Sequence, residues 1–246
     1  MAKITVNCGA TNIVVEGNAT VTITVPETPV ARYAEEDGGD AETREEESKG
    51  KAIDLQRIDP DFLRRLAIHE SGHAIVLYDL CPHIEIEYAT IVPSAEAQAC
   101  VMRSDFLLIA PPDHYAAICN YLAGVAAEKL LIGDHFAGAI DDLVNATEIA
   151  TTMVTKSGMG RRMGVRVFDG LAERDGESVR LANEDVNEIL SACRDAVRHH
   201  LAGNQDRILR FADELLEKKR LGFPDFERIL GPRQTSPIRI NASPPQ

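Results

Sequence analysis

"LAIHESGHAI", residues 66–75, is the stretch that determines how the rest of the chain is interpreted. It places His69 and His73 four positions apart, and residues at that spacing lie on one face of a helix, about one turn apart. Two imidazoles so arranged can point ring nitrogens at a single zinc ion. Glu70, rotated by about 100° around the helix, reaches the position where zinc holds a water molecule. A carboxylate there can take a proton from that water, so the pattern indicates metal-dependent hydrolysis.

The same short pattern also arises by chance in helices that merely carry two histidines, so the flanking residues matter. Both flanks, "LRRLAI" at 63–68 and "AIVLYDL" at 74–80, are apolar enough to predict a buried helix that excludes bulk water. Gly72 lies within this helix, although glycine there costs about 1 kcal/mol relative to alanine. We therefore expect another part of the chain to approach the helix closely at Gly72.

The remaining patterns predict a mainly helical fold with a small β-sheet edge. The histidine-bearing helix begins at Asp59, a cap followed by Pro60, and ends near Leu80, before Pro82. Alternation over 84–92 predicts a strand, with which "AQACVM" at 97–102 can pair. Further helices are expected at about 113–132, 141–157, 184–202, 204–220 and 225–230.

Composition divides the chain into four regions. Residues 3–25 alternate apolar and polar side chains around turn signals, which predicts two or three strands in a small β segment at 1–30. Residues 31–52 are strongly acidic and predict a flexible linker, because so few apolar groups cannot offset the entropy of ordering. A helical domain is expected at 53–231, and a proline-rich, disordered tail at 232–246.

Charge and cysteine usage narrow the possible partners and the compartment. The formal net charge of -13 repels phosphate backbones, so nucleic-acid binding is disfavoured. No apolar run approaches the roughly 20 residues that a membrane helix needs, and the first residues lack the order of a signal peptide. The five cysteines are scattered without a CxxC pair, which favours free thiols in a reducing compartment. We expect a cytoplasmic protein.

A zinc centre of this kind needs a third protein ligand. Asp79, six positions after His73, would require the helix to break at Val76, but the sequence there reads as continued helix, so Asp79 should face away. Glu128 lies in a very apolar helix and must have a partner if it is buried; it could orient a ligand histidine, act as a ligand, or be structural. The third ligand is therefore expected from a later helix. The other histidines are expected to be exposed at the surface, although His135 could instead line the cleft: His83, His114, His135, His199 and His200.

Several segments, in order, resemble the peptidase domain of FtsH-type AAA proteases. "AIHESGHAIV" resembles the zinc-binding helix of that family, and "ATIVPSA" the strand after it. "YLAGVAAEKLLIG" at 121–133 and "GAIDDLVNATEIATTMVTKSGMG" at 138–160 are similar to two further family segments. The closing helices also follow the family pattern, so the resemblance covers about 53–230. The chain departs from the family pattern at "PSAEAQACVM", residues 93–102, in the segment that the family uses to contact a substrate strand.

The resemblance implies a zincin-like helix, a C-terminal helical bundle and a set of site residues. His69 and His73 would be zinc ligands, Glu70 the general base, and Asp142, after the "GAxx" element, the third ligand. Homohexamers are implied as well. The chain has no GxxxxGK[ST] phosphate loop, so it should act on loose polypeptides unless a separate AAA ATPase delivers them.

We therefore expect a zinc metalloendopeptidase that hydrolyses unfolded or loosely structured polypeptides. Substrate is expected to bind extended along an edge strand near Tyr88 to Val92. The main alternative is a non-catalytic accessory module that regulates an AAA protease; its signature would be the loss of Glu70 or of a ligand, and neither is lost. A purely structural zinc site fits poorly, because such sites usually have four ligands rich in cysteine.

Overall fold

The computed structural model describes three N-terminal strands at the level of the backbone, and residues 59–92, 99–168 and 176–233. The chain divides into two compact units, Met1–Gly50 and Lys51–Gln246, which are described separately. The expected acidic linker at 31–52 lies outside the described residues, as does nearly all of the tail at 232–246. The borders of the four regions therefore stay predictions.

The N-terminal unit contains one antiparallel sheet of three strands, where the alternation of residues predicts two or three. The strands are β1 (Lys3–Cys8), β2 (Thr11–Glu16) and β3 (Thr20–Thr24), in the order β1-β2-β3. The register pairs Ile4 with Val15, and Val15 in turn with Val21. The apolar positions of the three strands thus stand opposite one another.

The helix that carries the two histidines is α2 (Pro60–Leu80), and it begins and ends where the sequence predicts. The Asp59 side chain accepts a hydrogen bond from the Asp61 backbone N–H at 2.9 Å, which satisfies one of the free donors of the first turn. Proline at the first helical position loses no hydrogen bond there. From Leu66 to Asp79 all side chains are buried, so α2 is the central helix of the larger unit.

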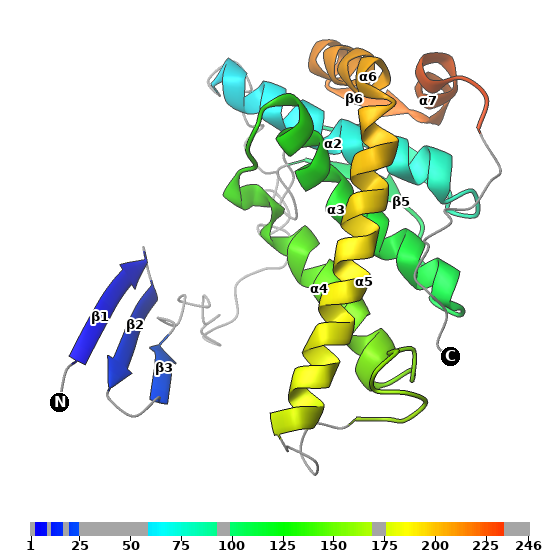
Figure 1. Ribbon diagram of the computed structural model, residues 1–246. Helices are drawn as coiled ribbons and strands as arrows, with labels where there is room; N and C mark the ends of the chain where they lie inside the picture. Colours follow the sequence, from blue (N-terminus) through cyan, green and yellow to red (C-terminus); the bar gives the residue numbers. More distant parts are fainter. Residues whose placement is uncertain are drawn as a thin grey trace, which may run out of the picture. The chain divides into compact units, whose positions relative to one another are not determined.

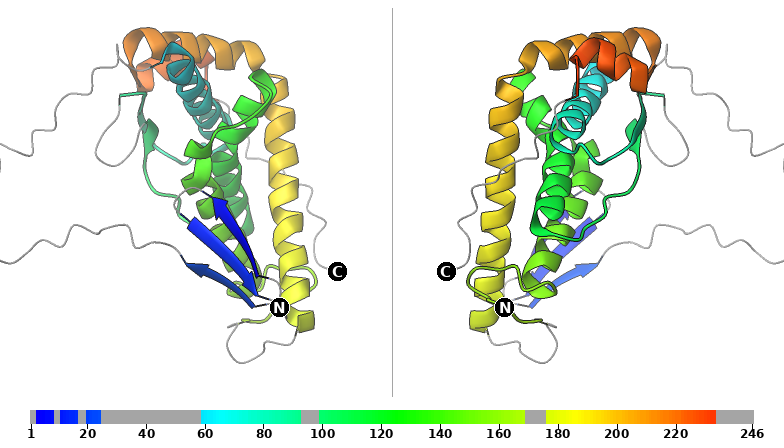
Figure 2. Two further views of the ribbon diagram at one scale, coloured as in Figure 1. Left: turned by 90° about the vertical axis from the view of Figure 1, so that its left-hand side faces the viewer. Right: turned by 90° about the vertical axis from the view of Figure 1, so that its right-hand side faces the viewer.

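Five further helices surround α2 and confirm the mainly helical fold (Figure 1). Helix α2 packs against α3 and α6, and α3 packs against α4 and α5. Figure 2 shows α6 and α7 together at the end of this unit where α5 finishes. The helices are α3 (Pro111–Leu131), α4 (Ile140–Thr155), α5 (Gly176–Ala202), α6 (Gln205–Lys218) and α7 (Phe223–Leu230), with a short 3₁₀ turn at Ala137–Ala139.

Helix α5 begins at Gly176, eight residues before the predicted start. Its first turns have little apolar periodicity and are held instead by ion pairs along the helix surface. Arg180 pairs with Glu177 at 2.6 Å and also contacts Glu184 one turn later. A pattern based on apolar spacing does not detect such a segment, although charged pairs three and four residues apart support a helix.

The small sheet overturns one expectation about substrate binding. Its strands are β4 (Ile86–Thr90), β5 (Cys100–Arg103) and β6 (Arg220–Gly222), in the order β5-β4-β6. Tyr88 pairs with Met102 on one side and with Gly222 on the other. Strand β4 is therefore the middle strand, and the prediction that a substrate adds along Tyr88–Val92 as an edge strand is wrong.

The sequence did not reveal β6 because the strand has only three residues. It follows α6 directly, where Lys219 turns the chain with a φ of 65°. The Arg220 guanidinium then lies 3.6 Å from the centre of the Tyr88 ring, which helps to hold β6 on β4.

The core of the larger unit is built on α2, where Ile75, Val76 and Leu77 are fully buried. Tyr78 is also fully buried and donates a hydrogen bond from its hydroxyl to the Gly231 carbonyl at 2.7 Å. Among the helices in the described ranges, none combines the length and the apolar character needed to cross a bilayer.

Candidate metal centre

The three residues predicted as metal ligands meet at one point. His69 and His73 lie on successive turns of α2, and Asp142 lies in the first turn of α4. Nε2 of His69 is 3.0 Å from Nε2 of His73 and 3.1 Å from Oδ2 of Asp142. Nε2 of His73 is 3.4 Å from the same oxygen. Within the described parts of the chain, this is the one such group whose ligand atoms all lie within 4.8 Å of one another.

Hydrogen bonds on the far side of each imidazole determine which nitrogen faces the shared point. Nδ1 of His73 is 2.8 Å from the Asn120 carbonyl oxygen, which can only accept, so Nδ1 carries the proton. Nδ1 of His69 is 2.6 Å from Oε1 of Glu128, which accepts in the same way. In the neutral rings both Nε2 atoms therefore present lone pairs, as metal-bound histidines do. Together with Asp142 they form a set of three electron-pair donors.

Three such donors repel one another at 3.0–3.4 Å unless a positive charge lies between them. Burial alone lowers the pKa of His69, but its hydrogen bonds to Asp142 and Glu128 outweigh this effect and raise that pKa to about 10. Burial raises the pKa of Asp142, but His73 and His69 outweigh it and hold that pKa well below its ordinary value. The arrangement therefore favours a cation at this point, and its donors fit a zinc ion.

Glu70 is buried beside the two histidines on α2. Burial raises the pKa of its carboxyl group, and the nearby His73 and His69 offset only part of that rise. No hydrogen bond to another described residue engages the carboxylate in the structure. A raised pKa brings a carboxylate closer to neutral pH, where it is a more effective proton acceptor than an ordinary glutamate.

Glu128 on α3 is fully buried and lies behind His69 rather than at the shared point. Oε1 accepts from His69 Nδ1, while Oε2 accepts from the Phe136 backbone N–H at 3.1 Å. The Arg65 guanidinium is 3.9 Å from Oε2. These are the contacts expected of a carboxylate that orients a ligand histidine, which was one of the three alternatives considered for this residue.

Close packing of α3 on α2 depends on two glycines. A Cβ atom at Gly72 would lie 2.5 Å from the Ala123 carbonyl oxygen, so α3 is the segment that approaches the histidine helix. A Cβ atom at Gly124 would lie 2.4 Å from Nε2 of His69. Sequence reasoning predicted the role of Gly72 but missed Gly124, because the side chain that it accommodates lies 55 positions away. The only local signal is the run of small residues at 123–127.

Asp79 faces away from this centre, as the sequence predicts. Arg207 donates to both of its oxygens, at 2.9 Å to Oδ1 and 2.6 Å to Oδ2, and Nε2 of His200 is 2.9 Å from Oδ2. His200 was expected to be exposed, and this expectation is wrong because the last turn of α5 places it in contact with Asp79 of α2, where its side chain is partly buried. His114 was also expected at the surface, but it is buried in α3, where Nδ1 donates to the Ala110 carbonyl oxygen at 2.9 Å.

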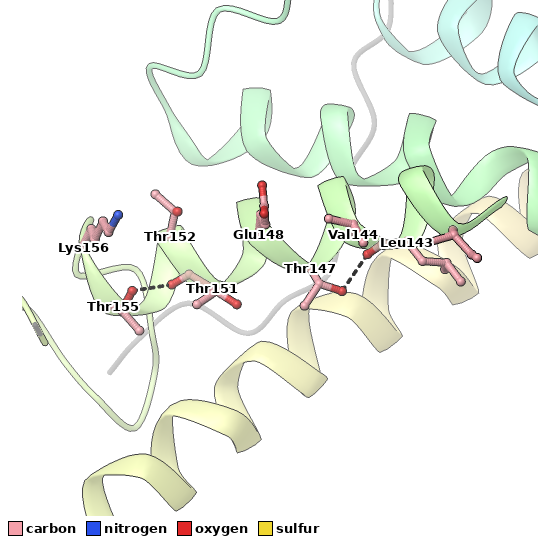
Figure 3. Close-up of a pocket in the computed structure, with 9 residues that line it drawn as sticks. Leu143, Val144, Thr147, Glu148, Thr151, Thr152, Thr155 and Lys156 are labelled. Carbon is pink, nitrogen blue, oxygen red and sulfur yellow. Dashed lines mark hydrogen bonds between the residues drawn. The ribbon is translucent and has the colours of Figure 1, made fainter. Parts of the chain in front are cut away.

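A groove of about 770 Å³ runs along the outer face of α4 but contains none of the candidate ligands. Figure 3 shows its side chains on one face of the helix, with the Thr147 and Thr155 hydroxyls donating to carbonyls one turn earlier. Thr151 follows Asp142 by nine residues, which is about 180° around a helix. The groove and the metal centre therefore lie on opposite sides of α4.

Comparisons with known proteins agree with the geometry of this centre. The model of Peptidase family M41 matches residues 57–229. ATP-dependent zinc metalloprotease FtsH 2 of Symbiobacterium thermophilum is 31% identical over 190 residues, which cover 74% of this chain and 32% of the relative. ATP-dependent zinc metalloprotease FtsH of Chlorobium luteolum is 32% identical over 191 residues, covering 72% and 27%. This chain thus spans about a third of the length of these relatives. The chain belongs to peptidase family M41 and carries the peptidase domain found in the FtsH-type proteases.

Proposed function

We propose that this chain is a zinc-dependent metalloendopeptidase that cleaves unfolded or loosely structured polypeptides. His69, His73 and Asp142 would hold the metal. The observation that carries the proposal is that these three electron-pair donors converge beside a buried carboxylate. Membership in family M41 and the names of the relatives support the same reaction class.

Zinc, if held by His69, His73 and Asp142, would supply the Lewis-acid chemistry that polarises the scissile carbonyl and activates a water molecule. Glu70 would accept a proton from the attacking water and pass it to the leaving amine. Glu128 and the Asn120 carbonyl hold the two imidazoles with Nε2 directed at the metal. The apolar surroundings of α2 strengthen these electrostatic interactions by excluding water.

The proposal extends to partners and location. The relatives are named ATP-dependent, so an AAA ATPase is a candidate partner that unfolds and delivers substrates. We also propose that the chain forms a homohexamer and is located in the cytoplasm. Cys81, Cys119 and Cys193 are buried free thiols, which suits a reducing compartment.

Metal analysis and cleavage of an unfolded, casein-like substrate, with and without a chelator, test the proposal. The purified protein should contain one zinc ion per chain and lose cleavage with the chelator. Glu70→Gln should keep zinc and lose about 10²- to 10⁴-fold in kcat, since a general base contributes that much. Glu217→Gln, at an exposed position on α6, is the matched control and should behave like the wild type.

The outcomes separate the enzyme from its main alternative. Zinc without cleavage in the wild type would favour a non-catalytic accessory module. Unchanged cleavage by Glu70→Gln would remove the role assigned to that carboxylate. A protein that takes up no zinc would overturn the proposal as a whole.

A further inference from the structure

We propose that Phe136 is a positioning residue, which fixes the His69 imidazole and links it to the start of the helix that carries Asp142. The inference rests on the proposed zinc site and assigns part of its alignment to a residue that is neither a ligand nor a proton carrier. Phe136 lies in the connection between α3 and α4, at residues 132–139.

Phe136 contacts His69 in two ways. Directly, the two rings meet edge to face, with centroids 5.9 Å apart and planes at 74°. Indirectly, the Phe136 backbone N–H donates to Oε2 of Glu128, and the other oxygen of that carboxylate accepts from His69 Nδ1. A single residue thus restrains both the ring plane and the hydrogen bond that sets the tautomer.

The Phe136 ring is itself held on two further sides. It meets the Phe62 ring of α2 edge to face, at 5.7 Å and 82°. On another side it packs directly on the backbone, since a Cβ atom at Gly138 would lie 2.2 Å from Cε2 of Phe136. Gly138 precedes the first residue of α4 by two positions, and Asp142 follows four positions after Gly138. The Phe136 ring therefore packs against the segment that leads into α4.

The imidazole of His69 also has no room to move toward α3. There it lies against Gly124 of α3, where even a Cβ atom would overlap it at 2.4 Å. The imidazole is thus in contact with both the α3 backbone and the Phe136 ring. Removing the Phe136 ring leaves room for the imidazole to rotate, and such a rotation turns Nε2 away from Asp142.

Two substitutions test the proposal by different routes. Phe136→Leu keeps an apolar side chain but removes the aromatic edge, and Gly138→Ala keeps the ring but displaces it. Both should weaken zinc binding about tenfold, the lower end of the range known for residues behind a metal ligand. Phe136→Tyr should bind zinc within about twofold of the wild type. Affinity is measured by competition with a chromophoric chelator, and urea unfolding of the metal-free proteins reports stability separately.

Phe106→Leu is the matched control, because Phe106 is another partly buried phenylalanine, which packs on Tyr121 and Arg103. Equal weakening of zinc binding by Phe106→Leu, or wild-type affinity in Phe136→Leu, would overturn the proposal. A second readout needs no metal: histidine ring NMR should show that the protected His69 Nδ1–H signal is lost in Phe136→Leu and kept in Phe106→Leu. An unchanged signal would also overturn the proposal, whereas absence of zinc from the wild type would overturn the proposed function.

Discussion

Helix α2 contributes residues to two clusters that combine histidine with carboxylate, and the clusters differ in where the protons are. The metal cluster consists of His69, His73 and Asp142, and the ion-pair cluster consists of Asp79, His200 and Arg207. In the ion-pair cluster, nitrogen donors reach both carboxylate oxygens, at 2.6–2.9 Å. In the metal cluster the Nδ1 proton of each imidazole is used on the far side, so in the neutral rings both Nε2 atoms face Asp142 as acceptors.

The comparison shows that residue types alone do not identify a metal site. Both clusters contain histidine and aspartate, and in both the side chains that α2 contributes are buried. The difference lies in the neighbours: Glu128 and the Asn120 carbonyl turn two lone pairs inward, whereas Arg207 supplies the compensating charge that Asp79 needs. One cluster therefore stabilises the fold, and the other is suited to bind a cation.

Removing Arg207 should have the largest effect, and only on stability. Arg207→Met leaves the Asp79 carboxylate buried with His200 alone. Loss of one partner of a buried pair costs about 3–5 kcal/mol, and the lower end applies because the Arg207 side chain is 18% exposed. Urea unfolding of the metal-free protein measures the loss, and zinc affinity should stay within twofold. A loss below about 1 kcal/mol, or equal to that of the exposed Arg194→Met, would contradict this assignment.

Removing the charge of Asp142 should mainly weaken zinc binding rather than lower stability. Asp142→Asn replaces an anionic ligand by a neutral one, and we expect zinc affinity to fall about 100-fold, which is about 2.7 kcal/mol. The free energy of unfolding without metal should fall by less than in Arg207→Met, since Asp142 is partly exposed, although His73 and His69 favour its ionised form. Competition with a chelating dye gives the affinity. Asp141→Asn, one position earlier and exposed, is the control, and a comparable loss there would argue against ligation by Asp142.

Filling the space beside His69 should give an intermediate effect. In Gly124→Ala the new Cβ atom would overlap the imidazole, so the ring must shift. We expect zinc binding to weaken about tenfold, as for other changes behind a ligand, with the ion-pair cluster unaffected. Gly176→Ala is the control because no atom lies within 4 Å of its added Cβ. Wild-type affinity in Gly124→Ala would show that the imidazole position is not constrained by α3.

The smallest expected effect is on the stability of the protein at acidic pH, through Asp79. Burial raises the pKa of Asp79, but hydrogen bonds from His200 and Arg207 outweigh this and lower it below its ordinary value. The pair therefore contributes its full stability above about pH 4, and this contribution is lost as pH falls through the folded-state pKa. Between pH 5 and pH 3 the free energy of unfolding should fall more steeply for the wild type than for Asp79→Asn. The two slopes against pH should differ by less than the slope that corresponds to uptake of about one proton. Urea unfolding across this range measures both slopes, and equal slopes would argue against the shift.

The sequence predicts best where a signal is local. Asp59 and Pro60 mark the start of α2, and the spacing of its histidines predicts a shared face; the structure confirms both. The place of Asp142 came from resemblance, since nothing in the spacing of the residues says that it meets a helix 70 positions earlier. The role of Phe136 follows from contacts that only the fold creates. Strand β6 was not predicted because three residues are too few to show the alternation of apolar and polar side chains that identifies a strand.

X-ray absorption at the zinc edge, on the purified protein with its metal, tests the central claim most directly. The account predicts two imidazole nitrogens at about 2.0–2.1 Å and carboxylate or water oxygens at about 2.0–2.2 Å, with no sulfur. The two-imidazole signal should be lost in His73→Ala and kept in His200→Ala. A sulfur ligand, or a zinc spectrum that His73→Ala leaves unchanged, would contradict the claim that the metal cluster on α2 is the catalytic centre.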